Sequence, residues 1–547
     1  MRVLIVGGVA AGASAAARIR RLDETAEIVL FERGPHISFA NCGLPYYVGG
    51  VIKEESKILV QTPESMKDRF QIDVRVDSEV LSINAEKKCI QVRHQGACVT
   101  EPYDALVLAP GAKPFVPPVP GVTLPQIIYM RNVEDANLMK IKAARAKRAV
   151  VIGGGFIGIE TAENLVEMGL EVVLVEAAPH ILAPFDSDMS PILEKEMEEH
   201  GVKIILNNGL SAFSQNGEEL KITLSDGQEL ATDFCLLSVG VRPDTKWLEE
   251  SGLEMNERGF ILTDEHMRTN LPDVYAAGDA VATKNLVTGK RIPIQLAGPA
   301  NRQGRIAADN IMGYTSRYKG SLGTSVIKVF SLAGAATGAN ERTLKGEGIP
   351  YQVAELHPKN HADYYPGACN MDIKVLYGEG GRIFGAQCVA AQGADKFIDV
   401  IASVMILGGK MSDLEDLELA YAPAFLSAKS PANYAGFIAS NKARGLLEEV
   451  PGNYLDEMNE NTVVLDVRKD DEVANAPLTG AIHIPVNDLR ARMGELEPYR
   501  EKTILTLCAT GVRSYIAYRM LKQHGFKVMS VRGGFRGYQA PRFQPSN

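Results

Sequence analysis

The sequence predicts an α/β protein in which two Rossmann-like units are followed by an α+β domain and a smaller α/β domain. A strand, a glycine-rich turn, a helix and a second strand occur at residues 3–32 and again at residues 149–176. Each copy has the order of a βαβ unit that binds a dinucleotide. With 547 residues the chain is long enough for about three or four domains.

The segments between and after the two units support this division. A buried strand within residues 105–112 closes the first unit, and residues 235–240 are its counterpart in the second. Residues 273–279 form a strand that ends on an acid, before a helix near residues 301–312. We therefore expect one dinucleotide-binding domain at 1–113 and 243–323, and the other at 114–242.

After residue 323 the pattern changes to short alternating strands and helices, which indicates an α+β domain over residues 324–440 without a nucleotide loop. Its expected strands and helix are 325–330, 373–377, 383–389 and 394–407. The composition of residues 441–458 is typical of a linker. Residues 459–547 then form a small α/β domain, with strands at 463–466, 480–485 and 503–508 and a helix at 514–524.

Charge and cysteine usage exclude several classes of protein. The net charge of −9 argues against nucleic acid or an anionic membrane as the main partner. The seven cysteines are scattered without CxxC spacing, which fits neither a disulfide framework nor a zinc site and suits a reducing cytosol. No signal peptide precedes the first strand, and no apolar run approaches the ~20 residues of a membrane span. We expect a soluble cytoplasmic protein without a bound metal.

The second glycine-rich turn matches GxGxxG in full, through Gly153, Gly155 and Gly158. These glycines permit a tight turn, a close approach of backbone to a pyrophosphate, and close packing of helix on strand. Glu176 is placed to accept a hydrogen bond from a ribose 2′-hydroxyl, and residues 177–180 contain no Arg or Lys to bind a 2′-phosphate. The pattern predicts a nicotinamide nucleotide site that favours NADH over NADPH.

The first turn is less regular, because Gly7 and Gly12 hold the outer positions but Val9 occupies the middle one. Glu32 ends the second strand and fits a ribose contact. Asp279 follows Gly278 at another strand end, where a carboxylate can reach a polyol chain. Together these features predict FAD at the first unit. The alternative is that Asp279 is only a turn acid or a helix cap.

Cys42 has no second cysteine near it, so it cannot store two electrons as an internal disulfide. Asn41 and Ser38 can donate hydrogen bonds to it, and an oxidised flavin nearby would stabilise a thiolate. A cysteine is often only a small core residue. The flanking Gly43 and Pro45 instead favour a shaped loop, and hence a reactive thiol.

Three arginines, Arg18, Arg20 and Arg21, lie on the helix that follows the first turn. They are either a solvated basic face, which is the usual outcome, or a local anchor for a polyanionic substrate in an acidic protein.

The first ~440 residues resemble coenzyme A-disulfide reductases, of the single-cysteine branch of the pyridine nucleotide–disulfide oxidoreductases. The likeness is carried by the first turn, the GxGxxG and these further segments: 38–47, 275–279 and 421–429. It implies that Cys42 is the redox centre of a homodimer. It also implies that Tyr421, and one of Tyr364 or Tyr365, reach Cys42 across the dimer interface, where a phenol could protonate a departing sulfur. From the residues alone these tyrosines are interpreted as packing residues, and the resemblance reverses that interpretation for Tyr421.

The same resemblance implies contacts with coenzyme A and with the two cofactors. The residues expected to contact coenzyme A are Ser14, Arg18, Arg21, Ser38, Asn41, Arg302 and Lys429. The residues expected to contact FAD or the nicotinamide nucleotide are Gly7, Gly8, Ala11, Gly12, Glu32, Arg33, Asn41, Gly111, Arg131, Gly153, Gly155, Gly158, Glu160, Glu176, Gly240, Gly278, Asp279 and Ala297.

The C-terminal ~90 residues resemble a rhodanese domain. Residues 508–513, Cys-Ala-Thr-Gly-Val-Arg, join a strand to a helix, so backbone N–H groups and the helix N-terminus converge on the sulfur. Such a cradle suits an anionic persulfide, and we expect Cys508 and Arg513 to be catalytic. Residues 466–468 and 533–538 match the framework of the family. Related dual-specificity phosphatases have a longer loop, so six positions favour sulfur over phosphate.

These features together resemble fusions of a coenzyme A-disulfide reductase with a rhodanese, which are NADH-dependent persulfide reductases. We expect Cys508 to accept sulfane sulfur and pass it to coenzyme A, and Cys42 to reduce the resulting persulfide to hydrogen sulfide. A tethered donor raises the effective concentration for this transfer. Three alternatives remain open: reduction of coenzyme A disulfide itself, an NADH oxidase or peroxidase with a Cys42 sulfenic acid, and a protein that is chiefly a sulfurtransferase.

Overall fold

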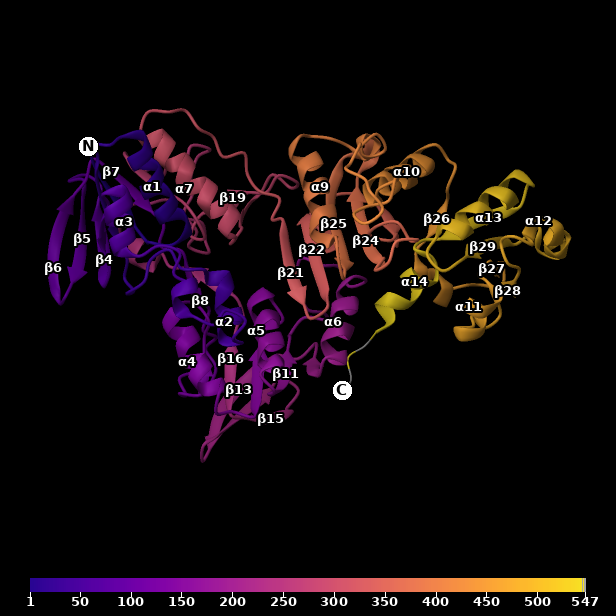
Figure 1. Ribbon diagram of the computed structural model, residues 1–547, viewed down its shortest axis with the longest axis horizontal. Helices are drawn as coiled ribbons and strands as arrows, with labels where there is room; N and C mark the ends of the chain where they lie inside the picture. The colour runs from indigo at the N-terminus through magenta and orange to yellow at the C-terminus, as the bar shows by residue number, and fades with distance from the viewer. Residues whose placement is uncertain (544, 546–547) are drawn as a thin grey trace. The chain divides into compact units, whose positions relative to one another are not determined.

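The computed structural model describes residues 1–543 and 545, and the chain divides into two compact units (Figure 1). Unit 1 consists of Met1–Ala178 and Gly201–Gly323. Unit 2 consists of Pro179–His200 and the chain from Thr324 onward. Each unit has its own sheets and its own buried cores, and each is described by itself.

The first sheet of unit 1 is parallel and five-stranded. Its strands stand in the order β18 (Val274–Ala276), β7 (Ala105–Leu108), β1 (Arg2–Val6), β2 (Glu27–Phe31) and β3 (Asp73–Arg75). Helix α1 (Ala10–Leu22) connects β1 to β2 and packs against α7 (Ala297–Ile311). The connections reverse direction between β1 and β7, and in such sheets ligands bind at the carboxyl ends of the strands beside this point.

The second sheet of unit 1 repeats the plan. Its parallel strands stand in the order β12 (Val202–Ile205), β11 (Glu171–Val175), β10 (Arg148–Ile152), β16 (Phe234–Leu237) and β9 (Ile127–Ile128). Helix α5 (Phe156–Glu167) follows β10 directly. Strands of this kind are almost wholly buried and apolar because helices cover both faces of the sheet. The predicted α/β fold with two βαβ units is confirmed.

Short elements complete unit 1, and several have no signal in the sequence analysis. Two antiparallel meanders consist of β4 (Ser78–Asn84), β5 (Cys89–His94), β6 (Ala97–Pro102), and β13 (Leu210–Asn216), β14 (Glu219–Leu224), β15 (Glu229–Thr232). The remaining elements are α2 (Leu44–Val48), α3 (Pro63–Phe70), α4 (Val133–Ala143) and the pairs β8 (Ala112–Pro114) with β17 (Val241–Pro243) and β19 (Ala282–Lys284) with β20 (Arg291–Pro293). Strand β6 is largely exposed, so it lacks the alternation that identifies a half-buried strand.

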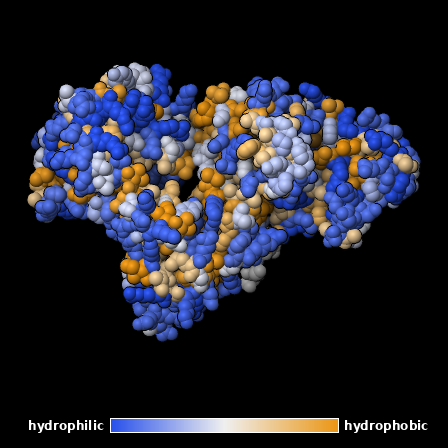
Figure 2. All heavy atoms as spheres, in the orientation of Figure 1, coloured by the Kyte–Doolittle hydropathy of each residue, from blue (hydrophilic) through white to orange (hydrophobic). Residues whose placement is uncertain are grey.

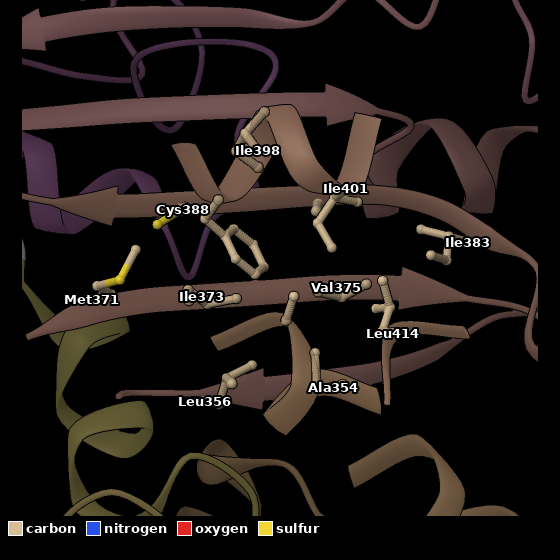
Figure 3. Packing of buried hydrophobic residues seen from close by; sticks show 14 of the residues in the cluster. Ala354, Leu356, Met371, Ile373, Val375, Ile383, Cys388, Ile398, Ile401 and Leu414 are labelled. Carbon is tan, nitrogen blue, oxygen red and sulfur yellow. The ribbon is translucent and has the colours of Figure 1, made fainter. Parts of the chain in front are cut away.

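Unit 2 contains an antiparallel five-stranded sheet that forms the α+β domain. Its strands stand in the order β21 (Ser325–Val329), β22 (Leu332–Gly338), β25 (Ile383–Ala390), β24 (Met371–Tyr377) and β23 (Gln352–Leu356). The accompanying helices are α8 (Glu341–Gly346), α9 (Ala394–Ile406) and α10 (Pro431–Ala443). Figure 3 shows the core of this domain, where Ile398 and Ile401 of α9 lie beside Ile373 and Cys388 of the sheet.

Helix α6 (Ser190–Glu199) follows β11 in the chain but belongs to unit 2. Its Leu193 and the preceding Phe185 lie against Gly334 of β22, where an added Cβ would press on both side chains. The sequence analysis includes residues 179–200 in the nucleotide-binding domain expected at 114–242. In the structure they belong to unit 2 instead. An amphipathic helix shows in sequence that it has a buried face, but not which sheet covers that face.

A buried lysine ties this segment to the α+β domain. Lys374 of β24 is 1% exposed, and its Nζ lies 2.6 Å from Asp188 Oδ2, 3.1 Å from Asp186 Oδ2 and 2.6 Å from Glu341 Oε1. Burial disfavours the charged amine, but the three carboxylates outweigh it and raise the pKa of Lys374. The cation therefore stays charged, and it compensates carboxylates that would otherwise be costly to bury.

The last domain of unit 2 has a parallel five-stranded sheet. Its strands stand in the order β26 (Glu449–Val450), β30 (Lys527–Val531), β29 (Thr503–Leu507), β27 (Thr462–Asp466) and β28 (Ile482–His483). Its helices are α11 (Asp470–Asn475), α12 (Leu489–Arg492), α13 (Val512–Gln523) and α14 (Gly534–Gln539). Strand β26 lies within residues 441–458, so part of the expected linker belongs to the sheet. Its two residues are too few to produce a periodic pattern.

Within unit 2, the segment from Arg532 to Gly537 joins this domain to the α+β domain. Arg536 binds Asp372 through Nε (2.5 Å) and Nη2 (2.7 Å), and Arg532 Nε lies 3.1 Å from Glu355 Oε2. A Cβ on Gly533 or Gly537 would overlap Glu355 Oε1, so glycine is needed for this approach. His357 Nδ1 lies 2.8 Å from Asp372 Oδ1. The contact is thus an ion-pair network that is largely buried.

The surface is mostly hydrophilic on the face shown in Figure 2, with apolar atoms gathered in smaller patches. In the described part of the chain, no helix is long and apolar enough to cross a membrane. The seven cysteines, all of which lie in that part, are free thiols.

Arg20 of helix α1 is neither part of a solvated basic face nor an anchor for a polyanionic substrate. It is 7% exposed, and its guanidinium donates five hydrogen bonds to backbone carbonyls. The acceptors are Phe70 O, Asp23 O, Glu24 O, Ala26 O and Gln71 O. Arg21, by contrast, is exposed and lies 5.2 Å from the Phe70 ring centroid. Arg20 therefore closes a helix end against a loop and has no part in binding.

Replacement of Arg20 by alanine should destabilise unit 1 strongly, because it leaves buried carbonyl groups without donors. We expect Arg20→Ala to cost about 3 kcal/mol and to lower the Tm of the first unfolding transition in calorimetry. Arg21→Ala, one residue away on the same helix, is the control and should cost less than about 1 kcal/mol. Equal losses for the two variants would contradict the structural role of Arg20.

Candidate functional site

The second glycine-rich turn has the shape that a pyrophosphate requires. Gly153 adopts φ +110°, which only glycine takes up easily, and its N–H donates to Val175 O at 2.8 Å. A Cβ on Gly158 would overlap Gly153 O, so helix α5 can approach the strand only with glycine there. Gly155, in contrast, faces open space within 4 Å of where its Cβ would lie. The turn therefore leaves its backbone accessible at the N-terminus of α5, and it fits a nicotinamide nucleotide.

Glu176 lies where the sequence analysis expects a ribose contact. Its Oε2 accepts from Gly154 N at 2.7 Å, and its Oε1 accepts from Ala178 N at 2.8 Å. The carboxylate is thus fixed beside the glycine turn at the end of β11. A carboxylate in this place can accept a hydrogen bond from a 2′-hydroxyl and repels a 2′-phosphate, so the residues fit NADH better than NADPH.

The first turn repeats these features despite Val9 in its middle position. Gly7 has φ +97°, and a Cβ on Gly12 would overlap Gly7 O, so helix α1 comes equally close. Glu32 Oε2 accepts from Gly8 N at 2.9 Å, and its Oε1 accepts from Gly34 N at 2.9 Å. The two units therefore hold the same glycine–carboxylate arrangement, and the first unit fits an adenine dinucleotide as well as the second.

Residues from four separate segments meet near Asp279. A Cβ on Gly111 would lie 2.8 Å from Arg131 Nη2, and Asn41 Oδ1 accepts from Arg131 Nη1 at 3.2 Å. Burial raises the pKa of Asp279, and Arg131 opposes that shift, so the guanidinium faces the carboxyl group. Helix α7 begins eighteen residues further on with Leu296 as its cap, so Asp279 is no helix cap. Its position fits a polyol chain at the strand ends, as the FAD prediction requires.

The other residues expected to contact a cofactor are spread over several elements of unit 1. Gly240 and Ala297 lie at the start of β17 and the start of α7, and Ala11 packs against Gly278. Arg33 Nη2 lies 2.9 Å from Asp244 Oδ2, so its charge is already paired with a protein carboxylate.

Cys42 lies in a 3-10 turn, Asn41–Gly43, immediately before α2. The residue is exposed. Surrounding protein nevertheless desolvates the thiol, and this effect, followed by the carboxylates of Glu160 and Asp279, raises the pKa of Cys42. The Asn41 amide donates to Phe39 O at 3.3 Å instead of to the thiol. Desolvation and the two carboxylates favour the thiol form, and activation of Cys42 by Asn41, Ser38 and a bound flavin stays a prediction.

Within unit 1, a hydrogen bond joins the Cys42 segment to helix α5 of the second βαβ unit. Tyr46 Oη donates to Glu160 Oε1 at 3.2 Å, and Glu160 lies on α5 two residues after Gly158, the last glycine of the GxGxxG. Burial raises the pKa of Glu160 to about 7, so this acid is half protonated near neutrality. The pKa of Tyr46 is also raised, by burial and then by Glu160. The sequence analysis did not single out Tyr46. Its only signal is its place four residues after Cys42 in the same segment.

The residues expected to bind coenzyme A in unit 1 divide into engaged and open side chains. Ser14 Oγ donates to Asn301 Oδ1 at 2.8 Å, and Arg18 Nε lies 2.6 Å from Asp309 Oδ1, both across α1 and α7. Arg302 stands 6.0 Å from the Tyr318 ring. Ser38 has φ +44° and donates its N–H to Gly8 O at 2.8 Å, so it lies beside the first turn. Arg21 is the most open cation of the set.

In unit 2, Tyr364 and Tyr421 form a pair. Their hydroxyl oxygens lie 3.1 Å apart, and the hydrogen bond with Tyr421 raises the pKa of Tyr364. Tyr364 is 76% exposed, which is unusual for an aromatic side chain. Tyr365 instead makes an edge contact with the His361 ring, with centroids 5.7 Å apart. Lys429 is exposed and lies 5.6 Å from the Tyr434 ring.

The Cys508 loop encloses its sulfur as the sequence predicts. Cys508 directly follows β29 and is 1% exposed, and Gly511 N donates to its Sγ at 3.2 Å. Ser514 Oγ lies 3.5 Å from the sulfur. Helix α13 begins at Val512, so its N-terminal partial charge faces the loop. The backbone of Cys508 is also held by Phe535, whose N–H donates to Cys508 O at 2.7 Å. The loop can therefore hold an anionic sulfur.

Arg513 is not a free cation at this loop. Its Nη1 lies 2.6 Å from Glu472 Oε2 and its Nη2 lies 2.7 Å from Glu472 Oε1, in a two-pronged ion pair. Arg513 lowers the pKa of Glu472 to about 2, so the carboxylate is charged at any physiological pH. The sequence analysis did not identify Glu472. Its spacing of four residues from Arg468 was the available signal.

The framework residues of the last domain meet behind the loop. Arg468 binds Asp466 through Nε (3.0 Å) and Nη2 (2.6 Å), and both side chains are buried. The Phe535 ring centroid lies 4.0 Å from the Arg468 guanidinium. In residues 1–543 and 545, no group of three or more His, Cys, Asp or Glu side chains is arranged to hold a metal.

Comparison with known families agrees with this geometry. Residues 1–308 match the pyridine nucleotide-disulphide oxidoreductase family, and residues 451–541 match the rhodanese-like domain. A coenzyme A disulfide reductase of Staphylococcus epidermidis is 34% identical over 445 residues, which are 80% of this chain and 99% of that protein. The chain therefore belongs to the pyridine nucleotide-disulphide oxidoreductase family. Members of this family use FAD and NAD(P)H.

Two solved structures resemble the chain over almost its full length. The reduced CoADR-RHD of Bacillus anthracis is 44% identical with a TM-score of 0.96, over 99% of this chain and 98% of that one. A NAD-dependent persulfide reductase from A. fulgidus is 34% identical with a TM-score of 0.93, over 98% of this chain and 100% of that one. The predicted class, an oxidoreductase of this family with a C-terminal rhodanese domain, is confirmed.

The open space beside Gly155 gives a test of the nucleotide site. We expect Gly155→Ala to raise the KM for NADH about tenfold, because the methyl group occupies the space where a pyrophosphate approaches. Flavin content and Tm should stay unchanged, since the chain itself has room for the methyl group. Gly346→Ala, which also adds a methyl group in open space, is the control. An unchanged KM in steady-state kinetics would place the nucleotide elsewhere.

The carboxylate of Glu160 gives a test of the electrostatics at Cys42. Glu160→Gln removes a negative charge that raises the pKa of the thiol, so the midpoint of Cys42 alkylation should move to lower pH. The effect should appear above about pH 7, where Glu160 is charged. The measurement is iodoacetamide labelling of Cys42 against pH, followed by mass spectrometry. Glu167→Gln, on the exposed end of the same helix, should leave the midpoint in place; a shift of equal size there would refute a local effect.

Proposed function

We propose that the protein is an NADH-dependent persulfide reductase that reduces coenzyme A persulfide or polysulfide to hydrogen sulfide, with Cys42 as redox centre and Cys508 as sulfur carrier. The observation that carries this proposal is the presence of two different cysteine sites in one chain. Cys42 is an exposed single thiol that lies between the two nucleotide turns in the sequence, and Cys508 is a buried thiol whose sulfur accepts a hydrogen bond from Gly511 N. The first can attack a sulfur, and the second can hold one.

The reduction balances without a second protein thiol. Cys42 as thiolate attacks the inner sulfur of coenzyme A persulfide, the S–S bond of the substrate breaks, and hydrosulfide leaves. A mixed disulfide between Cys42 and coenzyme A remains. FAD and NADH, when bound at the two glycine turns, supply the electron pair that reduces this disulfide. Cys42 and coenzyme A then each take a proton, and the net change is the reduction of one persulfide to a thiol and hydrogen sulfide.

Glu160 can accept or release a proton close to Cys42. Its pKa of about 7 lets it accept or release a proton near neutral pH, and it is hydrogen bonded to Tyr46. In its charged form it disfavours the Cys42 thiolate. Protonation of Glu160 therefore helps Cys42 to lose its own proton, so the two groups act as a coupled pair.

The proposed substrate contacts combine exposed side chains, such as Arg21 and Arg302, with Arg18 and Ser14, which already contact Asp309 and Asn301. In unit 1, Arg18, Arg21 and Arg302 supply positive charge for the phosphates of coenzyme A, and Ser14 and Ser38 supply hydroxyl groups. In unit 2 the proposed contact is Lys429. An arginine suits phosphate because its planar fork can donate two parallel hydrogen bonds.

We further propose that the protein acts as a homodimer in the cytoplasm. The pair of Tyr364 and Tyr421 supports this, because an exposed aromatic pair on a surface is typical of an interface. Their phenols would serve the Cys42 site of a second copy, where one can protonate a departing sulfur. Tyr365 is engaged with His361, so Tyr364 is the better candidate of the two.

Reduction of coenzyme A disulfide itself is the second candidate function. It is supported by the 34% identity to the coenzyme A disulfide reductase of Staphylococcus epidermidis over nearly the whole of that protein. The chemistry at Cys42 is the same, since a thiolate attacks a sulfur of coenzyme A and a thiol leaves. Only the leaving group differs, and in this case Cys508 has no part in the reaction.

Separate cysteine variants test the proposal. Sulfide release from coenzyme A persulfide with NADH should fall at least about 1,000-fold in Cys42→Ser, because the nucleophile is lost. Cys508→Ser should keep this activity but lose sulfide release from a donor that must first pass its sulfur to coenzyme A. Cys98→Ser, an exposed cysteine of β6, is the matched control. The measurements are sulfide by a colorimetric assay and NADH by absorbance.

Other outcomes point to other functions. If Cys42→Ser retains sulfide release and only Cys508→Ser loses it, the protein is a sulfurtransferase and the proposal is wrong. If coenzyme A disulfide is reduced faster than the persulfide, the second candidate is correct. Consumption of oxygen or peroxide that exceeds persulfide turnover would indicate an oxidase or peroxidase.

A further inference from the structure

The surroundings of Cys508 carry information about the charge of its sulfur donor. Arg513, the cation nearest to Cys508 in the sequence, also interacts with the Cys508 side chain. Both arms of its guanidinium bind Glu472, at 2.6 Å and 2.7 Å. A charge that is neutralised in this way attracts an anion only weakly, because the bound carboxylate repels the same anion.

The neighbouring cations of the last domain are neutralised as well. Arg468 is bound to Asp466, and the two arginines beneath the loop are bound to carboxylates of the α+β domain. The first turn of α11 adds further negative charge, because Asp470 and Asp471 precede Glu472. Lys469 is the one neighbouring cation on that turn. Apart from Lys469, each of the cations named here is therefore paired with a carboxylate.

The remaining surface at the mouth of the loop is apolar. Within the loop itself, the four residues between Cys508 and Arg513 are Ala, Thr, Gly and Val, none of which is charged. Val512 is 63% exposed, and Ile516, one helical turn later on the same face of α13, is 42% exposed. An incoming donor meets methyl groups and compensated charges at this mouth, while the sulfur beneath is almost wholly buried.

We propose that Cys508 takes its sulfur from an organic persulfide whose reacting end is uncharged or carries a single charge. In this proposal Glu472 makes the site discriminate against dianionic donors such as thiosulfate. This inference rests on the proposed role of Cys508 as a sulfur carrier, and it names the donor class for that site. Glu472 acts through Arg513, so it is a positioning and selectivity residue and touches no reacting atom.

The transfer step needs no further reactant. The Cys508 thiolate attacks the outer sulfur of the donor R–S–SH, a new S–S bond forms, and the S–S bond of the donor breaks. The electron pair leaves with the thiolate R–S⁻, and the proton remains on the transferred sulfur. With thiosulfate the same step would release sulfite, and two negative charges would have to approach the Glu472 carboxylate.

The test compares two donors in the full-length protein, with cyanide as the sulfur acceptor and thiocyanate as the product that is measured. The donors are N-acetylcysteamine persulfide and thiosulfate. The Cys42→Ser background removes the other reactive thiol, and the rate of the Cys42→Ser, Cys508→Ser double variant is subtracted. We expect kcat/KM for the persulfide to exceed that for thiosulfate by about 100-fold. Added potassium chloride should raise the thiosulfate rate, because salt screens repulsion.

Two variants assign the selectivity to charge. Glu472→Gln should raise the ratio of thiosulfate to persulfide kcat/KM about tenfold, since Arg513 then carries an uncompensated charge. Asp471→Asn, which leaves the pair of Arg513 and Glu472 intact, should shift the ratio in the same direction by about twofold. Glu495→Gln, in an exposed ion pair with Arg492 of the same domain, is the control.

The outcomes separate this inference from the proposed function. Equal kcat/KM for the two donors, a thiosulfate rate that falls with salt, or a ratio unchanged in both Glu472→Gln and Asp471→Asn would overturn the selectivity. If Cys508→Ser forms thiocyanate as fast as its parent with both donors, then Cys508 is no sulfur carrier, and the proposed function itself fails at that step.

Discussion

The site of unit 1 depends on one constraint: a single thiol must be held against two separate nucleotide turns. The hydrogen bond from Tyr46 to Glu160 meets it, because it joins the Cys42 segment to the helix that starts at the second turn. Tyr47 adds a hydrogen bond to Asn137 at 2.9 Å, and Gly49 lies so close to Asn164 that a Cβ would overlap its side chain. Burial of Glu160 at this place raises its pKa, while the hydrogen bond from Tyr46 opposes that shift, and a charged Glu160 in turn raises the pKa of Cys42.

Buried charges hold the rest of the molecule in one arrangement. Lys374, Arg20 and Arg468 are each buried, and each is matched by carboxylates or carbonyl oxygens. Such groups add little net stability compared with apolar side chains, but they penalise every arrangement that leaves them unpaired. They therefore specify where α6, the end of α1 and the Cys508 framework must lie.

Local patterns in the sequence predicted much of the fold. The two βαβ units, the GxGxxG and the loop of Cys508 follow rules that act over a few residues, so spacing alone reveals them. Tyr46, Glu472 and Arg20 were not identified, because their roles come from partners that are 114, 41 and 50 residues away. The membership of α6 in unit 2 was missed for the same reason. The pKa of Cys42 also depends on Glu160 and Asp279, which lie far from it in the sequence, so adjacent residues could not reveal this effect.

The segment from Arg532 to Gly537 has a consequence for protein engineering. On one side its backbone supports the Cys508 loop, through Phe535 N and Arg536 N, and on the other its arginines bind Asp372 and Glu355. The last domain therefore cannot be exchanged for another rhodanese domain without loss of these contacts. A rhodanese domain grafted from another protein would need two arginines and two glycines at these places, or it would leave the carboxylates of the α+β domain buried and unpaired. The two domains are therefore mutually dependent in structure.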